Sequence, residues 1–307
     1  MHKTAFLYPG QGSQCAGMGK DFYENSLLAA ELYHHAGEML KLDMKHLCFE
    51  ENDLLDHTSY TQAALVTTCL AMTRVLMAEG IRPDITAGLS LGEYAAIAVA
   101  GGFSEMEAIR LVRKRGILMQ NAVPDGFGAM CAVLALDEKV IEEVLSQMED
   151  VTIANYNCPG QIVITGRKAA VEEAAVKLKE AGARRCMMLN VDGPFHSPFL
   201  KEAGVELAKE LETVQFSPLQ IPYVTNVTAE EVTDVSETAD LLCQQISSPV
   251  RFMQSLSHML ESGVDRFVEI GPGRTLSGFL KKIDRQAEVY NVSAFADVQK
   301  VKEAFHV

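Results

Sequence analysis

The stretch Asp84-Ile85-Thr86-Ala87-Gly88-Leu89-Ser90-Leu91-Gly92-Glu93 decides the expected fold, because a short apolar run turns here into a long apolar segment. Gly88-Leu89-Ser90-Leu91-Gly92 matches the G-x-S-x-G nucleophile elbow, in which a serine occupies a sharp strand-to-helix turn. Glycines are needed there because a Cβ would clash where the backbone packs around the strained serine. The pattern predicts a strand over 84–87 and a helix over 93–100. The hydroxyl would then lie at a helix N-terminus, which favours a developing negative charge.

The motif alone leaves a second interpretation, a serine in a structural Gly-rich turn, since small residues are common in any α/β protein. A nucleophilic serine also needs a base, normally a histidine. Among eight histidines, His196 differs because it lies in the rigid segment Gly193-Pro194-Phe195-His196-Ser197-Pro198. A rigid loop at a domain junction suits a catalytic histidine, so we interpret Ser90 as the nucleophile and His196 as its base. The acid of an α/β-hydrolase triad has no clear candidate.

Strand-like and helix-like segments alternate through most of the 307 residues, which predicts an α/β fold with a mainly parallel sheet. One segment has a different order, β-α-β-β-α-β, which is ferredoxin-like. Its expected elements are strand 129–136, helix 138–148, a hairpin over 151–165, helix 169–181 and strand 185–191. We therefore expect a ferredoxin-like small domain over residues 127–193, inserted into a large domain of residues 1–126 and 194–307. A helix over 249–262 and a strand over 266–270 should follow.

The first strand ends in the Gly-rich loop Pro9-Gly10-Gln11-Gly12-Ser13-Gln14. The loop fits neither a Walker phosphate loop nor the dinucleotide fingerprint, because Gln14 and Cys15 stand where those motifs require glycine. Free backbone amides at the carboxyl end of a strand can instead donate hydrogen bonds to an oxyanion.

Arg115 borders the apolar face of a predicted helix that opens with Ser104-Glu105-Met106-Glu107, a capping box. It stands three residues from Val112 and four from Met119. From this pattern alone we interpret Arg115 as an arginine whose stem packs on the apolar face while its charge reaches solvent. A ligand clamp is the alternative.

Composition narrows the classes of function. The net charge of −14, without a basic tail, disfavours nucleic-acid binding. No apolar run reaches the length needed to cross a bilayer, and the first residues lack signal-peptide features, so we expect no membrane association. The seven cysteines are scattered without a C-x-x-C pair, which predicts neither a disulfide framework nor a metal site. They suit the core of a protein in the reducing cytoplasm.

Eight segments, in order along essentially the whole chain, resemble the malonyl-CoA:acyl carrier protein transacylases of fatty-acid synthesis and the related acyltransferase domains of polyketide synthases. The segments are Pro9-Gly10-Gln11-Gly12-Ser13-Gln14, Thr61-Gln62, Gly88-Leu89-Ser90-Leu91-Gly92-Glu93, Arg115-Gly116 with Met119-Gln120, Asn155-Tyr156-Asn157-Cys158-Pro159-Gly160-Gln161, Gly193-Pro194-Phe195-His196, Gln245-Ile246-Ser247-Ser248-Pro249-Val250 and Glu269-Ile270-Gly271-Pro272-Gly273. The resemblance implies an α/β-hydrolase-like large domain with a ferredoxin-like insert.

The resemblance also implies roles for individual residues. Ser90 would accept the acyl group and His196 would act as base, oriented by a backbone carbonyl near Gln245 rather than by an acid. The remaining roles are the oxyanion hole, formed by the backbone amides of Gln11 and Leu91, and substrate binding by Arg115, Gln62, Phe195 and Asn157. Arg115 would clamp the malonyl carboxylate, because a guanidinium matches a carboxylate with two parallel hydrogen bonds. One departure is Leu89, where the family usually has histidine.

The implied reaction is ping-pong transfer of malonyl from malonyl-CoA to the phosphopantetheine thiol of acyl carrier protein, without metal or cofactor, by a monomeric enzyme. A polyketide-pathway acyltransferase would share every motif. Less favoured alternatives are a serine thioesterase or hydrolase and a non-catalytic acyl-binding scaffold. Because carrier proteins are acidic, docking would need a local basic patch, for which the candidates are Arg184, Arg185, Lys281, Lys282 and Arg285. Ordinary solvated charges are the alternative for these residues.

Overall fold

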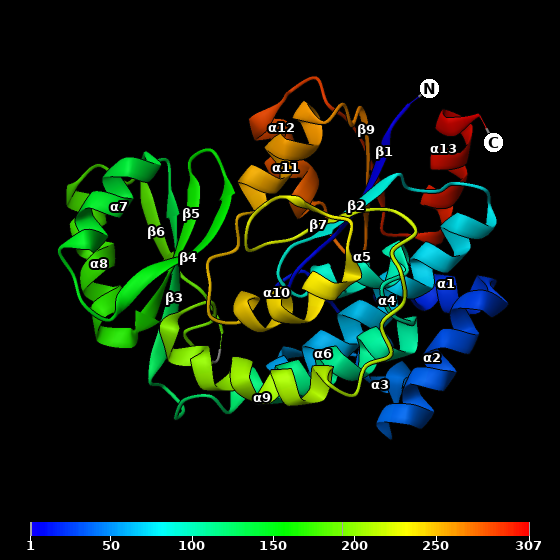
Figure 1. The fold of residues 1–307 in the computed structure, drawn as a ribbon, viewed down its shortest axis with the longest axis horizontal. Coiled ribbons are helices and arrows are strands. Elements are labelled where there is room, and N and C mark those ends of the chain that lie inside the picture. The colour runs from blue at the N-terminus through cyan, green and yellow to red at the C-terminus, as the bar shows by residue number, and fades with distance from the viewer. Residues whose placement is uncertain (1, 192, 307) are drawn as a thin grey trace.

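Two separate β-sheets organise the computed structural model, which describes residues 2–191 and 193–306 (Figure 1). The larger sheet has the strand order β10-β9-β1-β2-β7-β8, and it is parallel except for the β7–β8 pair. The smaller sheet, in the order β4-β5-β3-β6, is antiparallel throughout. The predicted α/β class with a mainly parallel sheet is confirmed.

The strands are β1 (Thr4–Tyr8), β2 (Ile85–Gly88), β3 (Gly128–Leu134), β4 (Val151–Cys158), β5 (Gln161–Arg167), β6 (Arg185–Met188), β7 (Tyr223–Val224), β8 (Glu231–Val232), β9 (Arg266–Ile270) and β10 (Glu288–Val292). The α-helices are α1 (Lys20–Asn25), α2 (Leu27–Leu40), α3 (Met44–Phe49), α4 (Thr58–Ala78), α5 (Gly92–Ala100), α6 (Glu105–Gln120), α7 (Glu138–Ser146), α8 (Lys168–Glu180), α9 (Lys201–Leu211), α10 (Thr238–Gln245), α11 (Phe252–Glu261), α12 (Thr275–Ile283) and α13 (Phe295–Phe305).

Strand β1 lies in the middle of the larger sheet and is buried along its whole length. Phe6 and Tyr8 belong to one apolar cluster, with residues of α4, α5 and α6. Ala5 and Leu7 belong to another, with residues of α11 and α12. Because successive side chains of a strand point to opposite faces, helices cover the sheet on both sides. This explains why β1 reads as a continuous apolar run rather than as an alternating one.

The nucleophile elbow has the predicted strand–turn–helix form. Strand β2 ends at Gly88, helix α5 begins at Gly92, and Ser90 between them has a φ of 50°. A Cβ on Gly88 would lie 1.9 Å from the carbonyl carbon of Gly92, and one on Gly92 would lie 2.2 Å from the carbonyl oxygen of Tyr8. The elbow therefore packs directly against the end of β1, which only glycine permits at these two positions.

The smaller sheet forms from residues 128–188 in the order β3-α7-β4-β5-α8-β6, with the predicted hairpin between β4 and β5. Helices α7 and α8 pack on one face of it and enclose a separate apolar cluster (Figure 1). The last strand was predicted to reach Val191, but β6 ends at Met188. The amide of Leu189 still donates to the carbonyl of Met130 on β3, and Leu189 and Val191 line a cavity that also receives residues of the larger domain. The domain boundaries themselves stay a prediction.

The helix expected over 249–262 begins later, at Phe252. Val250 is not helical because its backbone pairs with strand β4: its amide donates to the carbonyl of Ala154, and its carbonyl accepts from Tyr156. This bridge joins the chain after α10 to the smaller sheet.

Helix α4 corrects the expectation that no apolar run is long enough to cross a bilayer. Its 21 residues pass that test by length and composition, although 83% of its most apolar window is buried inside the protein. The packing of α4 against α2, α5 and α6 identifies it as a central core helix.

Candidate active site

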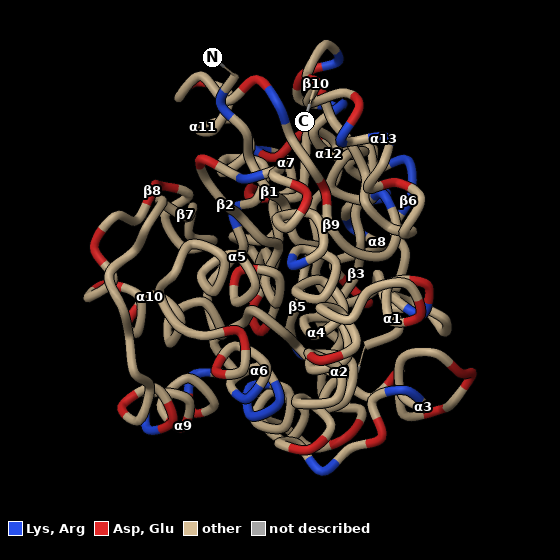
Figure 2. Tube along the Cα trace, turned by 90° about the vertical axis from the view of Figure 1, so that its right-hand side faces the viewer, with Lys and Arg blue, Asp and Glu red and all other residues tan. Residues whose placement is uncertain are grey.

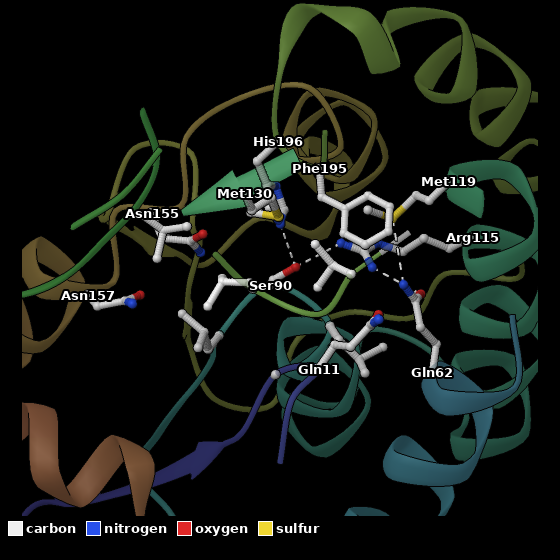
Figure 3. A pocket seen from close by; sticks show the side chains of 16 residues that line it. Gln11, Gln62, Ser90, Arg115, Met119, Met130, Asn155, Asn157, Phe195 and His196 are labelled. Atoms are coloured by element: carbon white, nitrogen blue, oxygen red, sulfur yellow. Dashed lines mark hydrogen bonds between the residues drawn. The ribbon is translucent and has the colours of Figure 1, made fainter. Parts of the chain in front are cut away.

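Ser90 and His196 lie in direct contact at the carboxyl edge of the larger sheet (Figure 3). The distance from Ser90 Oγ to His196 Nε2 is 2.7 Å, although 106 positions separate the two residues in sequence. The backbone amide of Ser90 donates to Asn226 Oδ1, 2.6 Å away, so the turn is fixed independently of the serine side chain. This geometry suits a serine activated by a histidine.

His196 is oriented by a backbone carbonyl. Its Nδ1 lies 2.8 Å from the carbonyl oxygen of Gln245. Because a carbonyl only accepts, Nδ1 carries the proton and Nε2 is free to accept from the Ser90 hydroxyl. Burial, and then the nearby charge of Arg115, lowers the pKa of His196 to about 4. The imidazole is therefore neutral near pH 7, as a general base must be.

Arg115 is buried, with 1% of its surface exposed, which corrects the interpretation of an arginine whose charge reaches solvent. Nη1 donates to Gln62 Oε1, and Nη2 donates to Ser90 Oγ and to Gln245 Oε1, each at 3.0 Å. All three acceptors are uncharged, and Nε has no partner among the described residues. Burial lowers the pKa of the guanidinium. A buried cation without a paired anion is costly, so the site is built to receive one.

Gln11 lies in the loop after β1, and Leu91 directly follows Ser90 in the elbow. Both line the cavity that contains Ser90. The loop after β1 reaches the elbow because Gly10 has no side chain: a Cβ there would lie 2.7 Å from the carbonyl oxygen of Leu89. The side chain of Gln11 is held by Thr58 Oγ1, 2.9 Å from its Nε2.

The cavity receives residues from both sheets (Figure 3). The predicted residues that line it are Gln11, Gln62, Ser90, Leu91, Arg115, Asn157, Phe195 and His196, together with Leu89. Gln245 touches the site through its hydrogen bonds instead. The other lining residues had no predicted site role: Gly10, Met119, Met130, Asn155, Val163, Leu189 and Val191. Asn157 Oδ1 is buried and has no partner within the described part of the chain.

Two further polar residues were missed. Asn226 bonds both ends of the elbow turn, because its Nδ2 also donates to the carbonyl of Gly88. Glu93 is fully buried and accepts from the Gln245 side chain. Asn226 could have been found from its position after strand β7, the parallel neighbour of β2. Polar residues at the carboxyl ends of adjacent parallel strands lie at the same edge of the sheet. Glu93 had a signal too, as a charged residue in an otherwise apolar helix.

No cluster of three or more His, Cys, Asp or Glu side chains that could hold a metal ion occurs in residues 2–191 and 193–306. What the site does contain is a serine–histidine pair with a buried guanidinium at hydrogen-bond distance. Such an arrangement can form an acyl-serine intermediate from a substrate that also carries an anion.

Comparison with known proteins gives a consistent family. Residues 5–304 match the acyl transferase domain family. The malonyl CoA-acyl carrier protein transacylase of Bacillus subtilis (strain 168) is 43% identical over 298 residues, which cover 95% of this chain and 94% of that protein. The crystal structure of MCAT from Streptococcus pneumoniae superposes with a TM-score of 0.94 at 43% identity, covering 98% of this chain and all of that one.

A further structure holds a type II polyketide synthase acyl-carrier protein in complex with its malonyl-transacylase. That transacylase is 36% identical to this chain, with a TM-score of 0.93 and coverage of 98% and 99% of the two chains. The family match spans nearly the whole chain, and it agrees with the serine–histidine geometry found independently. The chain belongs to the acyl transferase domain family.

Proposed function

We propose that the protein transfers the malonyl group from malonyl-CoA to the phosphopantetheine thiol of acyl carrier protein, and so supplies fatty-acid elongation. The observation that carries this proposal is the contact of Ser90 Oγ with both His196 Nε2, at 2.7 Å, and Arg115 Nη2, at 3.0 Å. A nucleophile beside a buried cation suits an acyl thioester that ends in a carboxylate. The 43%-identical relative from Bacillus subtilis, a malonyl CoA-acyl carrier protein transacylase, supports the same reaction.

In the first half-reaction Ser90 Oγ attacks the malonyl thioester carbonyl while His196 Nε2 takes the hydroxyl proton. The backbone amides of Gln11 and Leu91 stabilise the tetrahedral oxyanion. Coenzyme A leaves as its thiol after His196 returns the proton. In the second half-reaction the carrier thiol gives its proton to His196 and attacks the malonyl ester, and His196 passes that proton to Ser90 Oγ as the ester bond breaks. The Gln245 carbonyl keeps the imidazole in the required tautomer through both steps.

Arg115 binds the free carboxylate of the malonyl group, and Gln62 holds the guanidinium from the side opposite Ser90. The cavity has a volume of about 140 Å³, a small space that suits a short acyl group. Phe195, next to the base, leaves little room for a branch on the α-carbon and so favours malonyl over methylmalonyl. Asn157, whose Oδ1 lacks a partner among the described residues, would accept a hydrogen bond from the pantetheine arm.

The carrier protein would dock on a basic concavity formed by Arg184, Arg185 and Lys282, which line one hollow although Lys282 lies far from the two arginines in sequence. Lys281 is not part of this hollow, because its ammonium group donates to the carbonyls of Arg285 and Ala287. Local positive charge can attract an acidic partner despite the net charge of −14.

At the level of architecture we propose an α/β-hydrolase-like large domain, residues 1–126 and 194–307, and a ferredoxin-like small domain, residues 127–193. The β-α-β-β-α-β order of the smaller sheet supports the latter.

A monomer suffices, because one chain supplies every residue of the mechanism. No metal or cofactor is needed, since Ser90, His196 and Arg115 complete the chemistry. Seven cysteines with free thiols support the cytoplasm as the compartment.

A polyketide pathway is a second candidate for the destination of the malonyl group. The 36%-identical malonyl-transacylase found in complex with a type II polyketide synthase carrier favours it. Hydrolysis of plain monocarboxylic esters is disfavoured, because such substrates would leave the buried Arg115 unpaired.

The test is malonyl transfer from malonyl-CoA to holo carrier proteins of both pathways, with acetyl-CoA and methylmalonyl-CoA as controls. Brief incubation with malonyl-CoA should give a malonyl adduct in the intact mass of the wild type and none in Ser90→Ala. An adduct on the Ser90→Ala variant, or hydrolysis that outpaces transfer, would overturn the proposal.

A further inference from the structure

A buried carboxylate stands directly behind the nucleophile. Glu93 lies three residues after Ser90, in the first turn of α5, and has no exposed surface. Acidic side chains are almost never fully buried unless they are paired, because the charged form is desolvated. Glu93 takes no part in the proton transfers or the substrate contacts of the proposed reaction.

One carboxylate oxygen of Glu93 makes both of its hydrogen bonds. Oε2 accepts from Gln245 Nε2 at 2.6 Å and from the backbone amide of Asn226 at 3.1 Å. Oε1 is buried and has no partner within the described residues. The two hydrogen bonds that connect Glu93 to the site are therefore both at Oε2, and the Thr225 side chain is a further neighbour that lowers the pKa of the carboxyl.

Through Gln245, Glu93 reaches three residues of the site. Gln245 Nε2 also donates to the carbonyl of Ser90 at 2.9 Å, while its Oε1 accepts from Arg115 Nη2 at 3.0 Å. The backbone carbonyl of the same residue orients His196. Because a guanidinium only donates and a carbonyl only accepts, the amide group of Gln245 turns its oxygen toward Arg115 and its NH₂ toward the Ser90 carbonyl and Glu93.

Through Asn226, Glu93 reaches the elbow itself. Asn226 donates its backbone amide to Glu93. Its side chain accepts from the Ser90 amide and donates to the Gly88 carbonyl. Asn226, which bonds the turn at Ser90, is therefore itself hydrogen-bonded to Glu93.

Glu93 also lies near Arg115 without pairing with it, because Gln245 stands between them. The other ionisable groups that act on Glu93 or are affected by it are Tyr94 on its own helix and Tyr223 on β7, and burial raises the pKa of both phenols. Burial raises the pKa of Glu93 itself to about 7, opposed by its hydrogen bonds and by the Arg115 charge. Among the described residues no carboxylate bonds the guanidinium directly, so its charge stays available to a substrate carboxylate.

We propose that Glu93 is a positioning residue of the transfer reaction, which acts through Gln245 and Asn226 to hold Ser90, His196 and Arg115 in their relative places and to set the preference for an acyl group with a carboxylate. The inference rests on the proposed function. It assigns the role to the position of Oε2 rather than to the charge of the side chain.

Two conservative variants separate position from charge. Glu93→Gln keeps an acceptor oxygen at the place of Oε2 and puts its NH₂ where Oε1 has no described partner. Glu93→Asp keeps the charge but withdraws both oxygens by one methylene. We expect Glu93→Gln to stay within about 3-fold of wild type in kcat/KM for malonyl-CoA. We expect Glu93→Asp to lose about 10-fold or more, together with most of the malonyl-over-acetyl preference.

The preference ratio is the decisive readout, because a smaller folded fraction lowers both rates equally and leaves their ratio unchanged. Glu269→Gln is the matched control: Glu269 is as buried as Glu93, but its contacts are with Leu276, Ser277 and Asn291. The control should keep the wild-type ratio whatever its melting temperature. A wild-type ratio in Glu93→Asp, or a Gln variant worse than the Asp variant, would overturn the proposal.

A second readout does not depend on malonyl chemistry. The rate at which a sulfonyl fluoride labels Ser90, followed by intact mass, requires only the serine–histidine geometry. Labelling should be near wild type in Glu93→Gln and slower in Glu93→Asp. Equal labelling of the two variants would overturn the positioning role at Ser90, whether or not the wild type transfers malonyl. A wild type that is labelled normally but transfers no malonyl would overturn the proposed function alone.

Discussion

At the residue scale, Ser90 and His196 both adopt left-handed backbone conformations, with φ values of 50° and 58°. Such conformations cost on the order of 1–3 kcal/mol each in residues with a Cβ, and they persist only where surrounding contacts determine them. The Asn226 side chain supplies such a contact for Ser90, and the Gln245 carbonyl supplies one for His196. The strain brings a hydroxyl and a ring nitrogen to 2.7 Å.

The pH dependence of acylation should report the buried state of His196. The imidazole must be neutral to act as base, and a pKa of about 4 keeps it neutral down to that pH. We therefore expect kcat/KM for Ser90 acylation by malonyl-CoA to fall on the acid side near pH 4, measured by rapid quench. An acid limb near pH 6.5, the ordinary histidine value, would contradict the desolvated environment.

His196→Ala should slow both half-reactions by about 10²–10⁴-fold.

Arg115 variants should change which acyl group is transferred. Arg115→Ala removes the buried cation, so malonyl transfer should fall while acetyl transfer gains relative to it, by about 10-fold or more in their ratio. Arg115→Lys should also be poor, because an ammonium cannot form the two parallel hydrogen bonds of a guanidinium. Competition assays with the two thioesters give the ratio directly. If both variants keep the wild-type malonyl preference, Arg115 is only a packing residue.

At the scale of elements, the site depends on how closely β1, β2 and α5 approach one another. Gly92 permits the contact, since a Cβ would lie 2.2 Å from the carbonyl oxygen of Tyr8. The obstacle is backbone in a central strand and cannot move aside cheaply. The separation of Ser90 from the loop that carries Gln11 is set by this packing.

Gly92→Ala should therefore lower both stability and Ser90 reactivity. We expect a loss of several kcal/mol or failure to fold, at the upper end of the range for overpacked cores. Gly278→Ala is the matched control, because Gly278 also lies in a helix and a Cβ there meets nothing within 4 Å. That change should be neutral or stabilise by about 0.4–1 kcal/mol. Thermal unfolding and sulfonyl fluoride labelling measure the two effects, and equal behaviour of the variants would refute the packing argument.

At the scale of the whole molecule, charge is distributed unevenly. The protein carries a net charge of −14, and acidic residues are spread over many elements, with Lys or Arg beside β6 (Figure 2). The concavity of Arg184, Arg185 and Lys282 joins the smaller sheet to α12, so it exists only when both parts are assembled.

Reversing Arg184, Arg185 and Lys282 to Glu should raise the apparent KM for holo carrier protein by about 10-fold at low salt and weaken its salt dependence. The rate of Ser90 acylation should change much less, apart from any contact of the patch with the 3′-phosphate of coenzyme A. Lys20→Glu, an exposed charge on α1, is the control. Unchanged carrier kinetics at low salt would remove this surface from the docking role.

Several elements could be predicted from local sequence patterns alone. The elbow at Ser90, the hairpin over 151–165 and the strand over 266–270 follow from glycine spacing, turn residues and apolar runs, which act within a few neighbours. The expectation that no apolar run is long enough to cross a bilayer overlooked α4, and only its packing shows that this helix belongs to the core. The pattern of α6 likewise placed Arg115 only at the edge of an apolar face.

The contacts between residues distant in sequence arise only in the folded protein. It buried Arg115 against Ser90, Gln62 and Gln245, and it brought Asn226 and Glu93 behind the nucleophile. These residues come from α4, α5, α6, α10 and the segment after β7, and no local propensity records such a contact. The pairing of Val250 with β4, which delayed the start of α11, has the same origin. Local sequence fixes conformations, but the desolvation and hydrogen bonds that create this site arise only where distant segments pack together.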